Sequence, residues 1–401
     1  MLVSDTPHYE NIDFDIPSSW IITTLSEVFF MHAGKSISAA DISAEPNEKY
    51  RYLCVGGNGV RGYVSSYNTD GAHPIIGRQG ALCGNINYAE DLFYATEHAV
   101  VVDTFCETET WWAYYFLIQL NLNQYATATA QPGLSVNTIG DVQIPLPPLE
   151  EQKRIVAAIE QWFSLIDTLE TAKEDLQMCI AQTKSKILDL AIHGKLVPQD
   201  PNDEPAIELL KCINPKFTPC DNAQYMYDLP NNWEWTNLGN IGNWQSGGTP
   251  DRKNKLYYNG EIPWLKIADL QDNYVTEATE FISEEGLNNS SAKINPTGSV
   301  ALAMYGSIGK VGILTFPSTT NQAICVCSDY IVDQKYLFYY LISQRESFFM
   351  QSGGGVQANI SKQIIVKQPI PTPPLNEQRR IVAKIEELFT ILDEIQKSIE
   401  A

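Results

Sequence analysis

Apolar residues recur at alternating steps of three and four along one long segment of the chain. The pattern holds for about five heptads, through Ile155, Ile159, Trp162, Ile166, Leu169, Leu176, Ile180, Ile187 and Leu190, with only Lys173 and Thr183 polar on the seam. A sustained period of 3.5 residues is typical of a coiled coil. Pro147-Pro148 stands just before the pattern and His193-Gly194 just after it. The sequence therefore predicts one helix over residues 149–192, on the order of 65 Å long.

The same apolar period returns at the other end of the sequence. It predicts a shorter helix over residues 375–401, with its seam at Ile381, Ile385, Leu388, Leu392, Ile395 and Ile399. A narrow apolar seam requires a partner, and because both helices lie in one chain we expect them to pair with each other. The alternative is that each seam packs on its own domain. Pairing along the shorter helix would give a spacer of roughly 40 Å.

Two more segments of the sequence are duplicated. DIPSSW at residues 15–20 returns as DLPNNW at residues 228–233, which is 213 positions later. IPLPPLEEQKRIVAAIE at residues 144–160 returns as IPTPPLNEQRRIVAKIE at residues 370–386, with four differences in 17 positions. The material between these ends differs in residues and in length. The pattern indicates one architectural unit used twice, with a variable interior.

Each interior has the pattern of a mixed domain, so we expect an α+β chain. Short β-branched runs predict strands at Ala99–Val102, Ser299–Ala303 and Ile324–Cys327. Aromatic-rich amphipathic segments predict helices at Trp111–Leu120 and Gln334–Gln344. Glycine-rich corners, among them GGNG and GRQG, are typical of loops that approach a ligand closely. The expected division is a domain over 1–148, a helix over 149–192, a connector over 193–227, a domain over 228–374 and a helix over 375–401.

Composition and the ends of the sequence limit where the protein acts. The first ten residues are polar and acidic, which predicts no secretory signal. No apolar run approaches the roughly 20 residues that a membrane helix needs. The eight cysteines form no paired CxxC set, so we expect free thiols and no structural zinc. A cytoplasmic protein is the resulting expectation.

Catalytic motifs are missing from the sequence. The five histidines lie apart, no GK[ST] follows a strand, and no NPPY-like segment is present to hold a flipped adenine. The nearest approach to a nuclease site is Pro250-Asp251 followed by Glu261, and it lacks the lysine that such a site needs. These observations favour a binding protein without catalysis, metal or cofactor of its own.

The duplicated PLPPLEEQKRIVAAIE and PTPPLNEQRRIVAKIE segments strongly resemble the conserved regions of type I restriction-modification specificity subunits. ILDLAIHGKLVPQDPNDEPA at residues 187–206 resembles the segment that closes the first helix in that family. GGTPDRKNKLYYNGEIPWLKIADL at residues 247–270 is similar to the opening of a target-recognition domain. The second helix departs from the family pattern, because it is shorter and has no second GKLVP segment.

The resemblance implies two mixed α/β target-recognition domains separated by two long antiparallel coiled-coil helices, an internal two-fold repeat. Each domain would read one half of a bipartite DNA target. Two methyltransferase subunits would dock on the conserved regions, and two restriction-translocase subunits could join them. S-adenosylmethionine, ATP and Mg²⁺ would belong to those partners. The docking residues that the motif indicates are Pro148, Glu151, Gln152, Arg154, Pro374, Glu377, Gln378 and Arg380.

The net charge of −21 is unusual for a protein that binds DNA. Residues 1–148 carry 5 Lys and Arg against 16 Asp and Glu, and residues 228–374 carry 10 against 13. A broad basic field is therefore excluded in the first domain, and contacts must come from a few local residues. We expect the isolated chain to bind DNA weakly, with methyltransferase partners supplying most phosphate contacts.

Residue type and loop position select the candidates for DNA contact. In GRQG, a guanidinium beside an amide suits guanine and adenine edges, and the asparagine of GGNG is similar. In the second domain, basic residues alternate with Tyr257, Tyr258 and Trp264, which suits backbone contacts. The alternatives are that Arg78 forms a surface ion pair, and that the second segment is a solvated loop with Trp264 in the core. The candidates are Lys35, Asn58, Arg61, Arg78, Gln79, Arg252, Lys253, Lys255, Lys266, Lys310 and Asn359.

Three other functions fit parts of the pattern. An acidic protein can act as a DNA mimic or inhibitor, but the carboxylates here are scattered along the sequence. A methyltransferase-nuclease fusion would need the missing catalytic motifs. A scaffold that does not read DNA would leave the glycine-rich loops and the basic-aromatic segment unexplained.

Overall fold

The computed structural model describes residues 16–80, 82–105, 108–127, 132–212, 214–215, 217, 227–353 and 359–400. Contacts divide the chain into two compact units, unit 1 over residues 1–170 and unit 2 over residues 171–401. The long helix α4 (Leu149–Ile192) passes from one unit into the other.

Unit 1 is built from two four-stranded sheets and a strand pair. The sheet orders are β2-β9-β6-β7 and β4-β3-β8-β5, and β1 pairs with β10. The strands are β1 (Ile21–Thr24), β2 (Phe29–Ala33), β3 (Tyr52–Gly56), β4 (Gly59–Val64), β5 (Thr69–Asp70), β6 (His73–Gly77), β7 (Ile86–Ala89), β8 (Leu92–Ala95), β9 (Ala99–Thr104) and β10 (Gln143–Leu146). The helices are α1 (Leu25–Val28), η2 (Ala39–Asp41), α2 (Thr110–Leu120), η3 (Leu122–Tyr125), α3 (Val136–Gly140) and the first part of α4.

The apolar run AVVV at residues 99–102 forms the buried part of strand β9, at the centre of unit 1. It lies between β2 and β6, and all four residues of Ala99–Val102 are buried. Val100 and Val102 face a core that includes Trp112 and Leu117 of α2, whereas Val101 faces a second core. A strand buried on both faces is continuously apolar rather than alternating, so this run is a strand.

Unit 2 contains a five-stranded sheet in the order β12-β19-β16-β17-β14, a three-stranded sheet β15-β13-β18 and the pair β11-β20. The strands are β11 (Glu234–Asn237), β12 (Asn243–Ser246), β13 (Ile262–Leu265), β14 (Asn273–Val275), β15 (Phe281–Ile282), β16 (Val300–Ala303), β17 (Val311–Leu314), β18 (Thr319–Thr320), β19 (Ile324–Ser328) and β20 (Pro369–Thr372). The helices after α4 are α5 (Ala206–Lys211), α6 (Leu238–Ile241), η5 (Lys255–Tyr258), η6 (Ile267–Asp269), α7 (Glu284–Asn288), α8 (Gln334–Ser343), α9 (Arg345–Gln351), α10 (Lys362–Lys367) and α11 (Leu375–Glu400).

The two units repeat one topology. β1 pairs with β10 in unit 1 as β11 pairs with β20 in unit 2, and both pairs are antiparallel. The order β2-β9-β6-β7 corresponds to β12-β19-β16-β17. The parallel pair β3-β8 corresponds to β13-β18. This is the repeated architecture that the duplicated ends of the sequence predict, and unit 2 adds β14 at the edge of its sheet.

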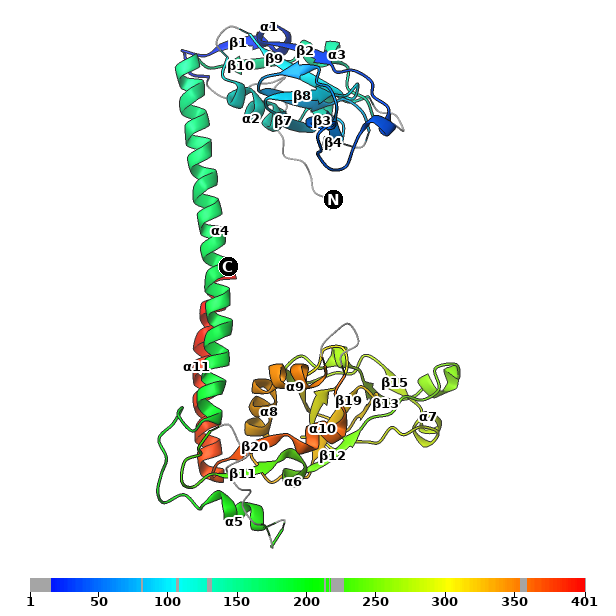
Figure 1. The fold of residues 1–401 in the computed structure, drawn as a ribbon, viewed down its shortest axis with the longest axis vertical. Coiled ribbons are helices and arrows are strands. Elements are labelled where there is room, and N and C mark those ends of the chain that lie inside the picture. The colour runs from blue at the N-terminus through cyan, green and yellow to red at the C-terminus, as the bar shows by residue number, and fades with distance from the viewer. Residues whose placement is uncertain are drawn as a thin grey trace. The chain divides into compact units, whose positions relative to one another are not determined.

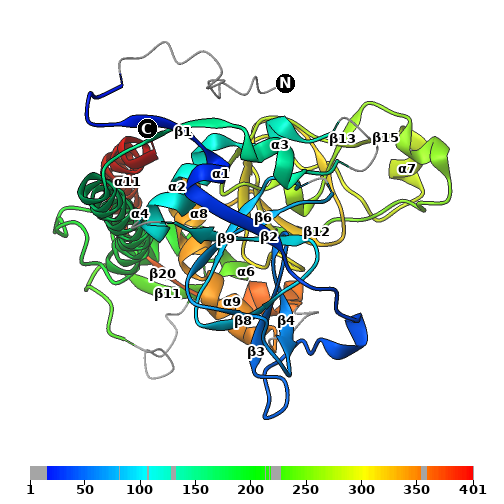
Figure 2. The same cartoon turned by 90° about the horizontal axis from the view of Figure 1, so that it is seen from above.

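Helices α4 and α11 pack side by side in unit 2 (Figures 1 and 2). Ile187 and Leu188 of α4 share one buried core with Ile381 and Ile385 of α11. Lys184 Nζ lies 2.5 Å from Asp393 Oδ1, so positions earlier in α4 meet positions later in α11. The two helices are therefore antiparallel, and the predicted pairing of the seams is confirmed here.

Other residues of the predicted α4 seam are exposed. Trp162 is 65% exposed and Leu169 is 62% exposed, whereas Ile180 and Ile187 are buried. Among the described seam residues, the fully buried ones lie in the last part of α4, and Ile155 at the start is half-buried against the core of unit 1. Helix α11 has 26 residues and α4 has 44, so α11 is too short to cover the whole seam of α4.

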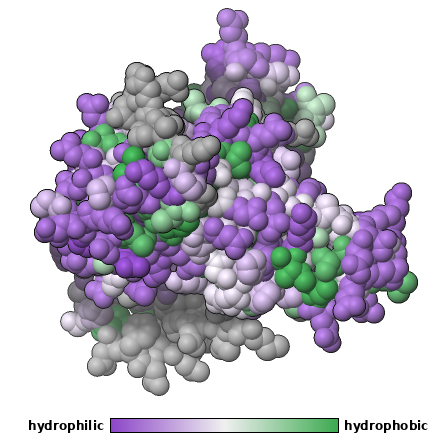
Figure 3. Space-filling model, turned by 90° about the horizontal axis from the view of Figure 1, so that it is seen from below, coloured by the Kyte–Doolittle hydropathy of each residue, from purple (hydrophilic) through white to green (hydrophobic). Residues whose placement is uncertain are grey.

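The sequence predicted the main elements at nearly the positions observed. α4 has the predicted bounds, and the strands and helices expected at 99–102, 111–120, 299–303, 324–327 and 334–344 are β9, α2, β16, β19 and α8. The face shown in Figure 3 is mostly hydrophilic, with hydrophobic residues in small separate patches. Within the described part of the chain, no helix combines the length and apolar character needed to cross a membrane.

Candidate nucleic-acid interface

A hollow of about 690 Å³ lies in unit 1, where four segments of the chain come together. Its wall includes the β3–β4 turn with Asn58, the start of β4 with Arg61, the corner after β6 with Gln79, and the loop before β9 with Glu97 and His98. The structure thus brings together three of the five DNA-contact candidates from this unit. The side chains provide donors and acceptors beside exposed backbone, which suits recognition of a polar ligand.

Two glycines hold these loops against each other. A Cβ atom on Gly57 would lie 2.5 Å from the His98 carbonyl oxygen, and one on Gly77 would lie 2.2 Å from the Gly57 carbonyl oxygen. Such distances exclude any larger side chain. Gly57 and Gly77 therefore allow close approach of backbone to backbone, rather than close approach of backbone to a ligand, and they fix the wall of the hollow.

The remaining basic candidates of unit 1 lie around this hollow. Lys35 follows β2, is exposed, and its backbone bridges to Thr96 in the loop before β9. Arg78 lines a neighbouring hollow with Gln79, and its backbone amide donates to the His98 carbonyl. Among the described residues, no carboxylate forms an ion pair with Lys35, Arg61 or Arg78. Their charges are therefore available for an anionic ligand.

Two basic candidates of unit 2 share one carboxylate. Arg252 Nη1 lies 2.8 Å from Glu280 Oε2, and Lys266 Nζ lies 2.7 Å from Glu280 Oε1. Hydrogen bonding from Lys266 holds the pKa of Glu280 below its ordinary value. Arg252 also stacks over Tyr258 and Trp264, at 4.5 and 4.7 Å from the ring centroids. Glu280 thus cancels part of the positive charge that the sequence presents here.

The aromatic residues of this segment divide between core and surface. Trp264 is 1% exposed, and its Nε1 donates to the Gly248 carbonyl at 2.9 Å. Tyr258 packs edge-on against it. Trp264 therefore belongs to the core, which was the alternative interpretation, and its ring packs beneath the Arg252 guanidinium.

The other candidates of unit 2 are exposed or half-buried. Lys253 lies just before η5 and Lys255 is its first residue, and both are exposed. Lys310 stands just before β17, and Asn359 bridges to Tyr305 in the corner after β16. Among the described carboxylates, none forms an ion pair with Lys253, Lys255 or Lys310.

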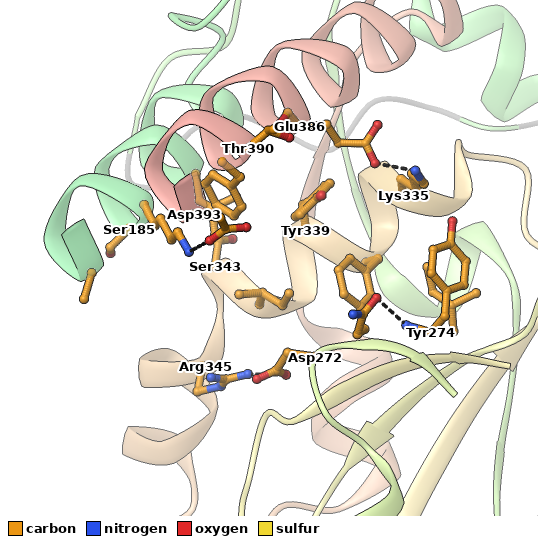
Figure 4. Close-up of a pocket in the computed structure, with 18 of the residues that line it drawn as sticks. Ser185, Asp272, Tyr274, Lys335, Tyr339, Ser343, Arg345, Glu386, Thr390 and Asp393 are labelled. Atoms are coloured by element: carbon orange, nitrogen blue, oxygen red, sulfur yellow. Dashed lines mark hydrogen bonds and ion pairs between the residues drawn. The ribbon is translucent and has the colours of Figure 1, made fainter. Parts of the chain in front are cut away.

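A larger groove of about 930 Å³ lies in unit 2 between α8, α11 and the end of α4 (Figure 4). Its cations all face carboxylates: Lys335 pairs with Glu386, Lys184 with Asp393, and Arg345 with Asp272 at 2.6 Å. Each cation of the lining is thus neutralised, and Glu346 adds one further carboxylate. This groove is a poor candidate for binding an anion such as DNA.

The residues expected to dock partners are partly occupied within the chain. Gln152 accepts a hydrogen bond from the Glu109 backbone amide and donates to the Pro147 carbonyl, both at 2.8 Å. Gln378 makes the same two contacts in unit 2, with the Asp333 amide at 2.7 Å and the Pro373 carbonyl at 2.9 Å. Glu109 and Asp333 are the N-cap residues of α2 and α8. The duplicated glutamine therefore joins the start of α4 to the start of α2 in unit 1, and the start of α11 to the start of α8 in unit 2.

Two more docking candidates of unit 2 contact the connector. Burial raises the pKa of Glu377, which accepts hydrogen bonds from Trp233 Nε1 and Gln199 Nε2. Arg380 forms an ion pair with the buried Asp203 at 2.7 Å. Pro374 is buried, whereas Pro148 and Arg154 are exposed and Glu151 is half-buried. Docking of a partner stays a prediction, and the exposed members of the set are the ones free to make it.

The described residues contain no group of three or more His, Cys, Asp or Glu side chains that could hold a metal ion. Cys325 and Cys327 of β19 are buried free thiols, and burial raises the pKa of Cys325 to about 12. Thiols of this kind are inert packing residues rather than nucleophiles. The hollow of unit 1 and the basic residues around it suit the binding of a polar, anionic ligand.

Sequence comparison identifies the repeated unit. A model of the type I restriction modification DNA specificity domain matches residues 17–178 and 230–401. The chain belongs to this family. The two matched segments coincide with the two copies of the topology, so each copy is one specificity domain.

Curated relatives carry names that agree with the family. The chain is 41% identical over 167 residues to the EcoprrI specificity subunit of Escherichia coli, a match that covers 42% of this chain and 41% of that protein. It is 34% identical over 178 residues to the EcoR124I/EcoR124II specificity subunit of Escherichia coli, covering 41% and 43%. The match to the Escherichia coli EcoDI specificity subunit is 21% identical and covers 96% of this chain and 84% of that protein. In the first two matches the chain spans only about two fifths of the relative's length.

Solved structures show the same fold. The HsdS subunit from Thermoanaerobacter tengcongensis aligns with a TM-score of 0.59 and 16% identity, over 96% of this chain and 93% of that one. A chain from a study of complex assembly and conformational transition in the type I R-M system aligns with a TM-score of 0.60 and 19% identity, over 96% and 94%. The predicted α+β fold with a helical pair is thereby confirmed.

Sequence reasoning missed Glu97, His98 and Glu280. The first two precede β9, and only the pairing of β9 with β6 and the approach of Gly57 bring them to the hollow. Glu280 lies 28 positions after Arg252, so no local pattern indicates that the two interact. Gln152 and Gln378 were found, because the duplicated EQ motif marked them, but their contacts within the chain were not expected.

Proposed function

We propose that this protein is the sequence-specific DNA-recognition subunit of a type I restriction-modification complex. It reads a bipartite target and directs partner subunits to methylate adenine or to cleave DNA. It has no catalysis of its own. The relatives support this proposal, because they are named as specificity subunits of type I restriction enzymes.

The observation that carries the proposal is one topology present twice with different side chains in its loops. Unit 1 presents Arg61, Gln79 and Asn58 around its hollow. Unit 2 presents Lys253 just before η5 and Lys255 as its first residue, both exposed. Base contacts specify a sequence, whereas phosphate contacts only position a protein. Two copies of a scaffold with unlike loops are therefore suited to read two unlike half-sites.

Partners complete the proposed activity. Two methyltransferase subunits dock on the conserved regions, and two restriction subunits can join them. S-adenosylmethionine, ATP and Mg²⁺ act in those subunits, and this chain contributes no cofactor. The complex acts in the cytoplasm, where the DNA lies.

The acidic net charge of the chain limits how many contacts it makes to DNA phosphates. With a net charge of −21, the chain lacks the basic field that gives tight non-specific binding. Specific contacts from a few free cations then select the target, and the methyltransferase subunits supply most contacts to phosphate. Strong DNA binding by the lone chain with a steep salt dependence would contradict this part of the proposal.

Methylome sequencing tests the proposed function. We expect cells that contain this chain and its methyltransferase partner to show adenine methylation at one split motif, and cells without the chain to show none. Exchanging the interior of unit 1 for that of another family member should change only one half of the motif. A scaffold would leave the motif unchanged after the exchange, and a DNA mimic would lower methylation at all sites.

Glu280→Gln should strengthen DNA binding by the assembled complex. The substitution releases Arg252 and Lys266 from their shared carboxylate. Each cation that then neutralises a phosphate steepens the dependence of log affinity on log salt by about 0.9, so we expect a steeper slope by about 1–2. Binding measured between 50 and 200 mM salt, roughly the range in which such effects are large, checks this. Glu277→Gln removes an exposed carboxylate of the same unit. If this control steepened the salt dependence equally, the pairing of Glu280 with Arg252 and Lys266 would not be what limits DNA binding.

A further inference from the structure

The loop before β9 in unit 1 and the loop before β19 in unit 2 occupy corresponding places. The backbone amide of Thr96 donates to β3, and that of Asn321 donates to β13 in the same way, at 2.9 Å in both units. β3 and β13 are the corresponding strands of the two parallel pairs. The next residue is Glu97 in unit 1 and Gln322 in unit 2. These two side chains therefore stand at one structural position.

Arg61 lines the same hollow as Glu97 in unit 1, and in unit 2 a lysine directly follows the corresponding strand β13. In unit 1 the side chain of Arg61 lies over Gly56, where a Cβ atom would be 2.8 Å from Arg61 Cδ. The residue of unit 2 that corresponds to Gly56 is Lys266, the residue after β13. In unit 1 the hollow thus brings Glu97 and Arg61 together, whereas in unit 2 the lysine at the place of Gly56 pairs with Glu280.

Glu97 has an oxygen without a partner. Its Oε2 is buried, and the described residues offer it no hydrogen-bond donor. Its Oε1 lies 3.7 Å from His98 Nε2, which is beyond ordinary hydrogen-bond distance. The side chain as a whole is 39% exposed and lines the hollow with Asn58 and Gln79. A buried acceptor that lacks a donor is costly, so this part-exposed carboxylate gains free energy by turning toward a ligand in the hollow that supplies a donor.

The chemistry of a carboxylate limits that ligand. An ionised carboxylate accepts hydrogen bonds and cannot donate them. In the major groove the donors on base edges are the N4 amino group of cytosine and the N6 amino group of adenine. On the basis of the proposed function, we propose that Glu97 is a specificity-determining residue, which accepts a hydrogen bond from an amino-bearing base in the half-site read by unit 1. Arg61 binds beside it and offsets its charge.

Gln322 is the counterpart of Glu97 in the other half-site. Its amide oxygen accepts a hydrogen bond from Thr249 Oγ1, and the side chain is otherwise exposed. An amide can donate as well as accept, and Gln pairs with adenine through both groups. One position with a carboxylate in one unit and an amide in the other gives the two domains different preferences without a change of fold.

Glu97→Gln in the complex with its methyltransferase partner tests the inference. The substitution keeps the size of the side chain but replaces one acceptor oxygen of the carboxylate by an NH₂ group, which donates hydrogen bonds. We expect methylation to become relaxed or altered at one base of the half-site read by unit 1, and the discrimination at that base to fall roughly 5–150-fold, as one lost base contact implies. The other half-site should be unchanged. Glu90→Gln removes an exposed carboxylate of unit 1 away from the hollow and should leave the motif as it is.

A binding experiment identifies the base itself. Duplexes are prepared in which each cytosine or adenine of the half-site is replaced, one at a time, by a base that lacks the major-groove amino group. At one position the replacement should weaken binding by the wild-type complex and have little effect on the Glu97→Gln complex, which is the signature of a direct contact. Equal losses for both complexes at every position would overturn the inference. An unchanged motif for Glu97→Gln would do so too, while absence of any split motif with the wild-type chain would instead overturn the proposed function.

Discussion

Gln378→Ala is expected to destabilise unit 2 by about 2–4 kcal/mol, because it removes a buried side-chain amide that is the hydrogen-bond partner of two backbone groups. The Asp333 amide at the N-cap of α8 and the Pro373 carbonyl before α11 lose their hydrogen bonds together. A buried backbone group left without a partner costs about 1–3 kcal/mol. Hydrogen exchange measured by mass spectrometry should show faster exchange at the starts of α8 and α11, since local opening becomes easier.

Gln152→Ala provides a matched test in unit 1. It should accelerate exchange at the starts of α2 and α4, with little change in peptides of unit 2. Glu150→Ala is the control, because Glu150 is exposed and forms a surface ion pair with Lys153, and a surface substitution of this kind stays within about 0.5 kcal/mol. If Gln378→Ala also stayed within that range, the glutamine contacts would not be structural, and partner docking alone would explain the duplicated motif.

Trp264→Ala should destabilise unit 2 by about 3–5 kcal/mol, as expected for truncating a fully buried tryptophan. The ring packs with Ile282 and Ala292, and its loss also removes the hydrogen bond to the Gly248 carbonyl. Exchange should accelerate across β13, β15 and β18. Leu256→Ala in the adjacent η5 should have little effect, because Leu256 is 65% exposed.

Trp264→Phe separates a structural role from direct DNA contact. It retains most of the packing and loses the Nε1 hydrogen bond, so we expect a loss of about 1 kcal/mol and unchanged DNA affinity of the complex. A clear fall in affinity without a fall in stability would contradict the burial of Trp264 and restore the interpretation of the basic-aromatic segment as a DNA-contact surface.

The periodic parts of this protein followed from the sequence. The heptad seam predicted the bounds of α4, and the duplicated ends predicted two copies of one architecture. These features are determined by residues close together in the chain, since helix period and strand alternation need no knowledge of distant partners. The apolar run AVVV also identified β9 correctly, because a strand covered on both faces has no polar positions.

Contacts between distant residues were decided only by the tertiary structure. Glu280 neutralises Arg252 and Lys266, and Gly57 meets Gly77, because strand pairing brings these positions together. Likewise, the correspondence of Glu97 with Gln322 depends on matched backbone hydrogen bonds, since the interiors of the two copies have diverged in residues and length. The sequence by itself determined which scaffold is repeated. Only the fold decided which side chains face the hollow and which of their charges remain free, because both depend on packing between segments with no local pattern in common.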